Sequence, residues 1–281
     1  MTIRAAVLGH PISHSLSPAL HNAAYEALGI DWHYEAIDVE EAAFEAFLAT
    51  CGDDWGGLSL TMPLKVEGAR IAHFVEPQAK LLGVINTLVP SGHGEYRQWV
   101  GANTDIHGIT AALGEGGCTA ARHGVVLGGG ATASSAVAAL GALGVKQPIV
   151  VVRSRARAGG LIRAATKMGL SPQLVTWDDP AVVVALAQAD AVVSTVPADA
   201  GASVGERLAA ADMDVRGVLL DVVYKPRVSL LALRWQEASG VTVDGTRMLL
   251  HQAGEQVRLM TGKVAPLGAM EAGMTALLNN S

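Results

Sequence analysis

Lys65 is the residue whose position most clearly points to acid–base chemistry. It closes the segment Ser59-Leu60-Thr61-Met62-Pro63-Leu64-Lys65, in which a strand ends at Thr61 and a helix begins near Pro63. A lysine in the first turn of a helix is disfavoured by the helix dipole. A local rule broken without visible gain indicates a functional position. We therefore expect an acid–base lysine here, the alternative being an ordinary surface lysine.

Asp105 is the candidate partner of this lysine. It follows Asn103-Thr104, which repeats at a second strand end the pair Asn86-Thr87. Amide side chains both donate and accept hydrogen bonds, so they suit a ligand that carries hydroxyls. We expect Asp105 to pair with Lys65, hold it in place and share its proton. Turn capping is the alternative for each Asn-Thr pair.

A serine-rich turn lies between the first predicted strand and the first predicted helix, at residues 9–18. We expect Ser17 to cap this helix and Pro18 to occupy its first position. Hydroxyls near a helix N-terminus, such as those of Ser15 and Ser17, suit a carboxylate. His10 and His14 lack the intervening Glu and the helix of an H-E-x-x-H site, so no metal is expected.

A glycine turn follows the apolar strand at residues 123–127. Gly128, Gly129 and Gly130 lead directly into a helix that begins with Ala131 and Thr132. Glycines allow a tight turn and close approach to a pyrophosphate, and the free N–H groups of the helix bind its charge. Ala133 stands where the usual dinucleotide fingerprint has its third Gly, and a simple tight turn is the alternative.

Three arginines follow the next strand, at residues 148–152. An NAD site carries an acid near this strand end, but here the chain reads Arg153-Ser154-Arg155-Ala156-Arg157. Arginine binds phosphate through paired hydrogen bonds, and Ser154 can donate another. The pattern indicates the 2′-phosphate of NADP, the alternative being a solvated basic start of a helix.

Two polar residues on later elements complete the candidates. Tyr224 follows the strand expected at residues 217–222, and Gln252 lies inside the first tail helix. Together they could close over a polyhydroxylated ligand. Alone, each is also explained as a satisfied structural polar group.

Short apolar runs alternating with helical patterns must position these residues. In the first hundred residues we expect strands at 4–9, 32–39, 57–62, 86–90 and 96–100, with helices at 17–28, at 40–50 and from 63. Residues 91–94 are expected to form the turn of a hairpin. Further strands are expected at 123–127, 148–152, 173–177, 191–194, 217–222 and 241–243. The helices between them are expected at 131–143, 156–168, 181–187, 205–210 and 230–239, with tail helices at 246–261 and 269–279.

Strands separated by helices of 10–15 residues predict a parallel, doubly wound sheet. The fold class is therefore α/β with two domains. An N-terminal α/β domain (1–105) is expected to include the returning C-terminal helices (246–281), and residues 106–245 are expected to form a Rossmann-like domain.

Composition excludes several classes of protein. Half of the 281 residues are hydrophobic and the net charge is −6, which excludes a disordered chain. No block of Lys or Arg indicates nucleic-acid binding. Cys51 and Cys118 have neither zinc nor disulfide spacing, and no signal peptide is evident, so a cytoplasmic location is expected. Residues 125–145 lack charge, but the glycine turn favours a strand and a helix over a membrane span.

Several of these segments together resemble the shikimate dehydrogenase family over nearly the whole chain. Residues 9–22 match its motif G-x-P-I-x-H-S-x-S-P-x-x-H-N, and residues 59–65 match N-V-T-x-P-x-K with Ser59 in place of Asn. The family's V-N-T, N-T-D-x-x-G and G-A-G-G-A motifs correspond to residues 85–87, 103–108 and 128–132. Its N-R-T-x-x-R, D-x-x-Y-x-P and M-L-x-x-Q motifs correspond to residues 152–157, 221–226 and 248–252.

This resemblance implies a role for each matching residue. The substrate carboxylate would bind Ser15 and Ser17, and the catalytic pair would be Lys65 and Asp105. The ring and its hydroxyls would be held by Thr61, Asn86, Tyr224 and Gln252. NADP would be held by Gly128, Gly129, Gly130, Ala131, Thr132, Arg153, Ser154 and Arg157, with Gly245 and Met248 near the nicotinamide. Ser59 would shorten a ligand-facing side chain, and Val152 would remove one ribose contact.

The reaction implied is the reversible, NADPH-dependent reduction of 3-dehydroshikimate to shikimate in aromatic amino-acid (chorismate) biosynthesis, by a monomer or homodimer. A quinate or dual quinate/shikimate dehydrogenase is an alternative, although an NAD-preferring relative should carry an acid near Arg153 and Arg157. A non-catalytic NADP-binding sensor would not need Lys65 and Asp105 together. A folate dehydrogenase is disfavoured by the serine turn.

Overall fold

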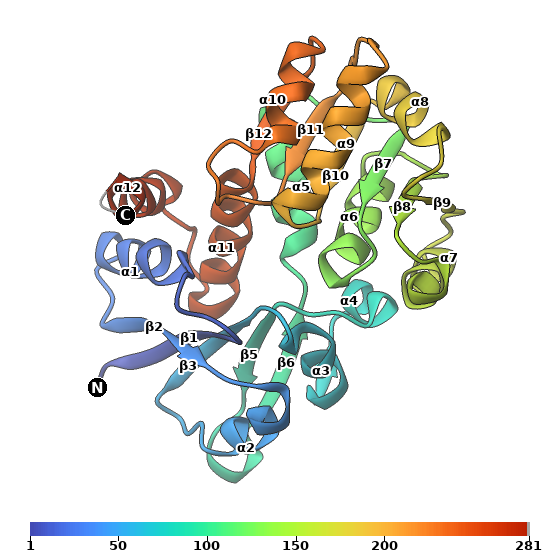
Figure 1. Ribbon diagram of the computed structural model, residues 1–281. Helices are drawn as coiled ribbons and strands as arrows, with labels where there is room; N and C mark the ends of the chain where they lie inside the picture. The colour runs from blue at the N-terminus through green and yellow to red at the C-terminus, as the bar shows by residue number, and fades with distance from the viewer. Residues whose placement is uncertain (280–281) are drawn as a thin grey trace. The chain divides into compact units, whose positions relative to one another are not determined.

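The structure is a computed structural model that describes residues 1–279, and it divides into two compact units (Figure 1). Unit 1 comprises Met1–Thr104 together with the chain from Leu249 onward. Unit 2 comprises Asp105–Met248. The chain therefore leaves unit 1 once and returns to it once, and each unit contains its own sheet.

Unit 1 contains a mixed sheet with the strand order β2-β1-β3-β5-β6-β4. Strand β1 pairs in parallel with both β2 and β3, whereas β5 is antiparallel to β3 and to β6. The strands are β1 (Ile3–Gly9), β2 (Trp32–Asp38), β3 (Trp55–Leu60), β4 (Phe74–Val75), β5 (Thr87–Ser91) and β6 (Gln98–Ala102). Because β1 lies between β2 and β3, the chain crosses over in opposite directions from β1, which makes this edge of the sheet a topological switch point.

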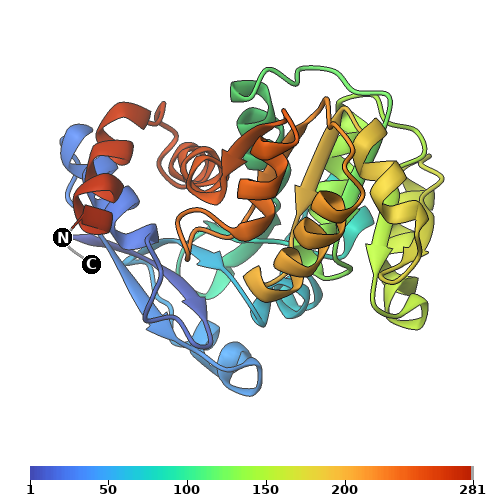
Figure 2. The same ribbon diagram turned by 45° about the horizontal axis from the view of Figure 1, so that its top comes forward.

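Helices cover both faces of this sheet. They are α1 (Ser17–Ala27), η1 (Glu41–Ala43), α2 (Phe44–Ala49), α3 (Leu64–Ile71), α4 (Pro77–Leu82), η2 (Gly94–Tyr96), α11 (Gly245–Thr261) and α12 (Leu267–Asn279). One core includes Leu8, Phe44, Leu58 and Leu64, which lie on β1, α2, β3 and α3. In Figures 1 and 2, α12 runs beside α1, and a Cβ on Gly273 would lie 2.7 Å from Cβ of Ala23.

Unit 2 contains a fully parallel sheet with the strand order β12-β11-β10-β7-β8-β9. Read from β9, this is the order 3-2-1-4-5-6 of a dinucleotide-binding doubly wound fold, with its switch point between β7 and β10. The strands are β7 (Gly124–Leu127), β8 (Ile149–Val152), β9 (Gln173–Thr176), β10 (Ala191–Ser194), β11 (Val218–Asp221) and β12 (Val241–Asp244).

The helices of unit 2 lie on both sides of this sheet, so strands such as β7 are buried along their whole length. One core joins the strands to side chains of α8, α9 and α10, among them Leu186, Leu208 and Trp235. The helical segments are α5 (Asp105–Glu115), α6 (Ala131–Ala142), η3 (Arg155–Ala158), α7 (Gly159–Lys167), α8 (Ala181–Gln188), α9 (Ala198–Ala210) and α10 (Leu230–Glu237). Strands covered on both faces read as continuous apolar runs, which is why they were recognisable in the sequence.

The predicted fold class is confirmed, with corrections to individual elements. Leu16, which already has helical backbone angles, caps α1, so the prediction of Ser17 as its cap is wrong. Helix α9 begins at Ala198 instead of residue 205. Its early residues include weak helix formers, but Gly205 lets α10 approach closely: a Cβ there would lie 3.1 Å from Cα of Leu231. Elements β4, α4 and α5 were not expected.

The uncharged stretch at residues 125–145 forms β7, the glycine turn and α6. Within residues 1–279, no helix has the length and apolar character needed to cross a membrane.

Candidate active site

The predicted serine turn lies at the switch point of the sheet in unit 1. It follows β1, and its His10 N–H donates to the Met62 carbonyl beyond the end of β3, at 3.0 Å. A Cβ on Gly9 would lie 2.4 Å from Cγ2 of Thr61 and 2.7 Å from the Met62 carbonyl oxygen. Glycine at position 9 therefore allows the two loops to meet, and ligands bind at such switch points in open sheets.

Ser15 and Ser17 lie together in this turn. The Ser17 N–H donates to Ser15 Oγ at 3.3 Å, and the Ser17 carbonyl accepts from Nδ1 of His21 at 2.9 Å. His21 is fully buried, and burial lowers its pKa to about 4. The imidazole is therefore neutral near pH 7 and acts as a fixed donor that holds the start of α1.

Tyr34 contacts both His21 and Ser59, the residue that stands where the family motif has Asn. Its ring stacks on that of His21, with centroids 3.9 Å apart and planes 12° apart. Its hydroxyl donates to Ser59 Oγ at 2.6 Å. Ser59 is only 4% exposed, so this hydrogen bond lies in the interior of unit 1 and joins β2 to β3.

Lys65 lies in the first turn of α3, as predicted, directly after the end of β3. Thr61 precedes the helix, and its carbonyl accepts from the Leu64 N–H at 2.8 Å. The Lys65 carbonyl in turn accepts from the Ile85 N–H at 3.0 Å. Helix α3 is thus tied to the chain immediately before Asn86.

The two Asn-Thr pairs meet each other in unit 1. Asn86 Nδ2 donates to Thr104 Oγ1 at 2.9 Å, and Asn86 Oδ1 accepts from the Thr104 N–H at 2.8 Å. Asn86 Nδ2 also donates to Oε1 of Gln252, at 3.2 Å. Asn86 is 1% exposed and Gln252 is 7% exposed. A buried amide with several partners is held rigidly, because an unpaired polar group in the interior is unfavourable.

Thr87, already singled out with Asn86 in the sequence, belongs to the same network, and so does Gln256, which was not recognised in the sequence. Gln256 Nε2 donates to the Asn86 carbonyl and to Thr87 Oγ1, both at 3.1 Å. Its Oε1 atom is buried, and no described residue bonds to it. The available signal was the spacing of Gln252 and Gln256, which lie four residues apart on one face of α11.

Asp105 is the first residue of α5 and belongs to unit 2, whereas Lys65 belongs to unit 1. Asp105 is 3% exposed and directly follows Thr104, whose hydroxyl and N–H are bonded to Asn86. The pairing of Lys65 with Asp105 stays a prediction.

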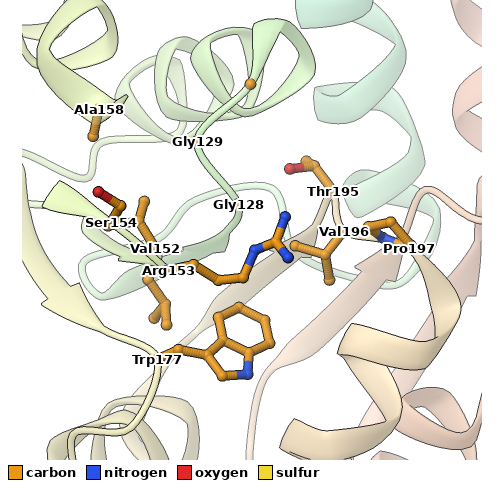
Figure 3. Close-up of a pocket in the computed structure, with 12 residues that line it drawn as sticks. Gly128, Gly129, Val152, Arg153, Ser154, Ala158, Trp177, Thr195, Val196 and Pro197 are labelled. Atoms are coloured by element: carbon orange, nitrogen blue, oxygen red, sulfur yellow. The ribbon is translucent and has the colours of Figure 1, made fainter. Parts of the chain in front are cut away.

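Unit 2 contains a cavity of about 340 Å³ at the carboxyl ends of adjacent strands. Its walls come from the residues that follow β7, β10, β8 and β9, on both sides of the switch point (Figure 3). The lining is Gly128, Gly129, Gly130, Val151, Val152, Arg153, Ser154, Ala158, Trp177, Thr195, Val196 and Pro197. This is the position at which a doubly wound sheet binds a dinucleotide.

The three glycines have different physical requirements. Gly128 has φ +120°, and a Cβ there would lie 2.3 Å from Oγ1 of Thr195. A Cβ on Gly129 would lie 3.1 Å from Val152, whereas a Cβ on Gly130 would meet nothing within 4 Å. Gly130 is also the cap of α6, with no side-chain hydrogen bond to the helix. The helix start is therefore open to a phosphate oxygen.

Arg153 and Ser154 follow β8 and line the same cavity. Arg153 is exposed, and among the described residues none forms a hydrogen bond or ion pair with its side chain. The described lining includes no carboxylate. Arg157 lies in η3, and its side chain is outside the described part of the structure.

The remaining candidates are four cofactor residues, Ala131, Thr132, Gly245 and Met248, and the substrate residue Tyr224. Ala131 and Thr132 begin α6. Gly245 begins α11, where a Cβ would lie 2.2 Å from the Val222 carbonyl oxygen, and Met248 is buried one turn later. Tyr224 is half-buried in the loop after β11, and burial raises the pKa of its phenol.

Chemically, unit 1 presents hydroxyls, amides and an ammonium group, while unit 2 presents a glycine turn with an uncapped helix start in the same cavity as an arginine. Within residues 1–279, no group of three His, Cys, Asp or Glu side chains could hold a metal ion. The fold and these groups define a two-unit α/β protein of the dinucleotide-binding class, with a separate polar site at the switch point of a second sheet.

Comparison with known proteins gives the family. Residues 7–88 match the shikimate dehydrogenase substrate binding domain, and residues 245–272 match the shikimate 5′-dehydrogenase C-terminal domain. Shikimate dehydrogenase (NADP(+)) from Thermosynechococcus vestitus is 34% identical over 97% of this chain and 94% of its own length. The chain belongs to the shikimate dehydrogenase family.

Solved structures agree with this assignment. The crystal structure of Mycobacterium tuberculosis shikimate dehydrogenase is 41% identical, has a TM-score of 0.87, and matches 98% of this chain and 99% of its own. A second similar structure is that of shikimate 5-dehydrogenase from Thermus thermophilus in complex with NADP(H) and shikimate. It is 28% identical, has a TM-score of 0.79, and matches 98% of this chain and 99% of its own. The chain spans only 17% of the length of two pentafunctional AROM polypeptides of Lodderomyces elongisporus that it also matches.

Proposed function

We propose that this protein is an NADP-dependent shikimate dehydrogenase, which reversibly reduces 3-dehydroshikimate to shikimate in aromatic amino-acid biosynthesis. The observation that carries the proposal is the cavity of unit 2, which combines an open helix start with Arg153 and no carboxylate among its described lining residues, in a chain of this family. A 2′-phosphate needs a cation at this position, whereas the ribose hydroxyls of NAD need an acceptor.

The residues of unit 2 fit NADP. Gly130 leaves room for a phosphate beside the free N–H groups of α6. Arg153, Ser154 and Arg157 would hold the 2′-phosphate, and Gly245 and Met248 would lie by the nicotinamide. When bound, the reduced cofactor supplies the hydride for the carbonyl carbon of the substrate.

The residues of unit 1 would hold the substrate. The hydroxyls of Ser15 and Ser17 would bind its carboxylate, since both lie at the start of α1. Thr61, Asn86 and Gln252 would bind the ring hydroxyls, and the family motif assigns the same role to Tyr224. The network that holds Asn86 orients its amide in advance, so little conformational entropy is lost when a ligand binds.

Lys65 would act on the oxygen that becomes the alcohol. In the reducing direction its ammonium group stabilises the developing alkoxide and donates a proton to it. Asp105 would orient the amine and share its proton. Such general acid–base assistance accelerates a reaction about 10²–10⁴-fold.

Initial rates with the Lys65→Ala variant test this mechanism. We expect kcat to fall by at least about 10²-fold, with little change in KM for NADPH, because the amine acts on the reacting oxygen and not on the cofactor. Lys80→Ala, which changes an exposed lysine on α4 of the same unit, is the matched control. A near-normal kcat for Lys65→Ala would remove this lysine from the mechanism.

Rates with shikimate and quinate, each tested with NADP and NAD, check the substrate and the cofactor. We expect shikimate with NADP to be the preferred pair. A preference for quinate with NAD would refute the assignment, and no shikimate-dependent absorbance change at all would favour a non-catalytic NADP-binding protein.

We further infer that the reaction takes place in the cytoplasm and that the protein is a monomer or homodimer. Cys51 and Cys118 are free, buried thiols, which suit a reducing compartment. Light scattering coupled to size exclusion would measure the molar mass in solution, and a tetramer would contradict the second inference.

A further inference from the structure

Trp177 lines the cavity of unit 2 but belongs to no motif that marked the site in the sequence. It follows β9, the edge strand of the sheet, and its N–H donates to the Val152 carbonyl at 3.1 Å. Because Val152 pairs with Thr176 in the parallel register, Arg153 and Trp177 leave neighbouring strands side by side. Figure 3 shows both side chains extending into the same space, with Thr195 and Val196 on its other side.

The indole ring has a fixed orientation. Its Nε1 donates to Ser203 Oγ on α9 at 3.2 Å, and this hydroxyl donates in turn to the Ala200 carbonyl at 2.8 Å. The Trp177 carbonyl accepts from the Arg207 guanidinium. One part of the ring packs against the core, and the remainder is exposed to the cavity. A ring held in this way loses little freedom when a second ring packs on it.

The cavity is divided chemically. Arg153, Ser154 and the glycine turn form its polar part. Trp177 belongs to the apolar part, with Val151, Val152, Ala158, Val196 and Pro197. The adenosine 2′-phosphate half of NADP has the same division, because it joins a phosphate and hydroxyls to a flat aromatic base.

We propose that Trp177 is a specificity-determining residue of the cofactor site, which stacks on the adenine base and so selects the adenosine half of the cofactor. This inference rests on the proposed function. It adds to the arginine contact a second, uncharged source of affinity, which depends on the π-face of the indole and not on the 2′-phosphate. Stacking of a base on an aromatic side chain is commonly large enough to change affinity about 10-fold or more.

Calorimetric titration of the full chain with 2′,5′-ADP tests the inference, because this ligand carries the adenosine half and lacks the nicotinamide. We expect Trp177→Leu, which keeps apolar bulk but has no π-face, to bind about 10-fold more weakly than the wild type. Trp177→Phe should stay within about threefold, because it keeps an aromatic face. Ser203→Ala, which releases the indole N–H, should lie between these two.

Further measurements separate this inference from the proposed function. Val184→Ala changes an exposed side chain on α8 outside the cavity lining and should bind as the wild type does. Urea unfolding of Trp177→Leu shows whether the variant is folded at the temperature of the titration, and Trp177→Phe keeps the test decisive if it is not. If the wild type fails to bind 2′,5′-ADP, the proposed NADP site is wrong. If the wild type binds but Trp177→Leu binds equally tightly, or Trp177→Phe is as weak as a non-aromatic variant, stacking by Trp177 is refuted and the function stands.

Discussion

Replacing Gly128 with alanine should destabilise unit 2 through two separate effects. The φ of +120° is a conformation that side-chain-bearing residues rarely adopt, and holding one there costs about 1–3 kcal/mol. The added Cβ would also lie 2.3 Å from Oγ1 of Thr195. That hydroxyl donates to the Leu127 carbonyl at 2.9 Å, so moving it away forfeits a hydrogen bond worth about 1 kcal/mol.

The sum is about 2–4 kcal/mol of unfolding free energy, which is a large part of the roughly 5–15 kcal/mol that is typical of a folded domain. At the roughly 2–4 °C per kcal/mol found for domains of about 150–250 residues, the melting temperature should fall by roughly 4–16 °C. Urea unfolding followed by circular dichroism measures the loss directly, and the slope m should not change.

A double-mutant cycle separates the two effects. Thr195→Ala removes the oxygen that the added methyl group would meet, so the double variant should be about 1 kcal/mol more stable than the sum of the single changes. The φ strain persists in either background. Full additivity would refute the steric argument, and wild-type stability of Gly128→Ala would refute the whole reasoning.

Gly130→Ala is the matched control in the same turn. A Cβ there meets nothing within 4 Å and the backbone is extended, so stability should change by less than about 1 kcal/mol. The methyl group would nevertheless occupy the space proposed for a phosphate. Losing one hydrogen bond to a charged oxygen, about 1.5–3 kcal/mol, would weaken NADP binding roughly 10- to 100-fold. Unchanged NADP affinity in this variant would contradict the proposed position of the pyrophosphate.

Three further predictions concern buried groups. Because burial lowers the pKa of His21 from 6.5 to about 4, the unfolded chain binds a proton below pH 6.5 that the folded chain does not bind until about pH 4. The free energy of unfolding should therefore fall by about 3 kcal/mol over this window as pH decreases. Urea titrations at several pH values should show this pH dependence in the wild type and not in His21→Gln. Parallel curves for the two proteins would exclude His21 as the source of the pH dependence. Asn86→Ala leaves buried partners unpaired and should lower the unfolding free energy by about 3 kcal/mol or more. Chemical denaturation measures this loss. A loss below about 0.5 kcal/mol would show that the network is not important for stability. Burial raises the pKa of the Cys51 thiol to about 11 and that of Cys118 above its usual value, so both should react with Ellman's reagent at about pH 8 only slowly until denaturant is added; rapid reaction in the native protein would contradict their burial.

Much of the fold was predictable because both sheets leave periodic signals. The strands of unit 2 are buried on both faces, so each reads as a short apolar run between helices. The two glycine- and serine-containing turns were also predictable, because Gly128 and the Ser15–Ser17 segment lie where a strand gives way to a helix. The boundaries were less accurate. Leu16, for example, continues the helical conformation one residue before the serine expected to cap it.

Elements that depend on tertiary contacts were missed. Helix α4 has six residues and β4 has two, too few for a periodic pattern to be distinguished. Gly205, at which α9 was expected to begin, lies inside this helix and in close contact with α10. A glycine in a sequence ordinarily argues against a helix.

The candidate residues were visible in the sequence by type, but their partners were not. Asn86, Thr104 and Gln252 are brought together from the start of β5, the end of β6 and α11, over separations in sequence that no local pattern spans. Gln256, Tyr34 and Trp177 carry no local signal of a site, and only the fold places them beside the candidate residues.

The chain itself determined the chemistry on offer: a lysine at a helix start, hydroxyls in a turn, glycines before a helix and arginines where an NAD site has an acid. These follow from local rules of dipoles, backbone angles and charge, which act over a few residues. Tertiary structure alone decided which of these groups are buried, which amides satisfy one another, and that an indole following the edge strand lines the cavity beside Arg153. Burial and hydrogen-bond partnership depend on distances through space, and these are set by how the strands are ordered in each sheet.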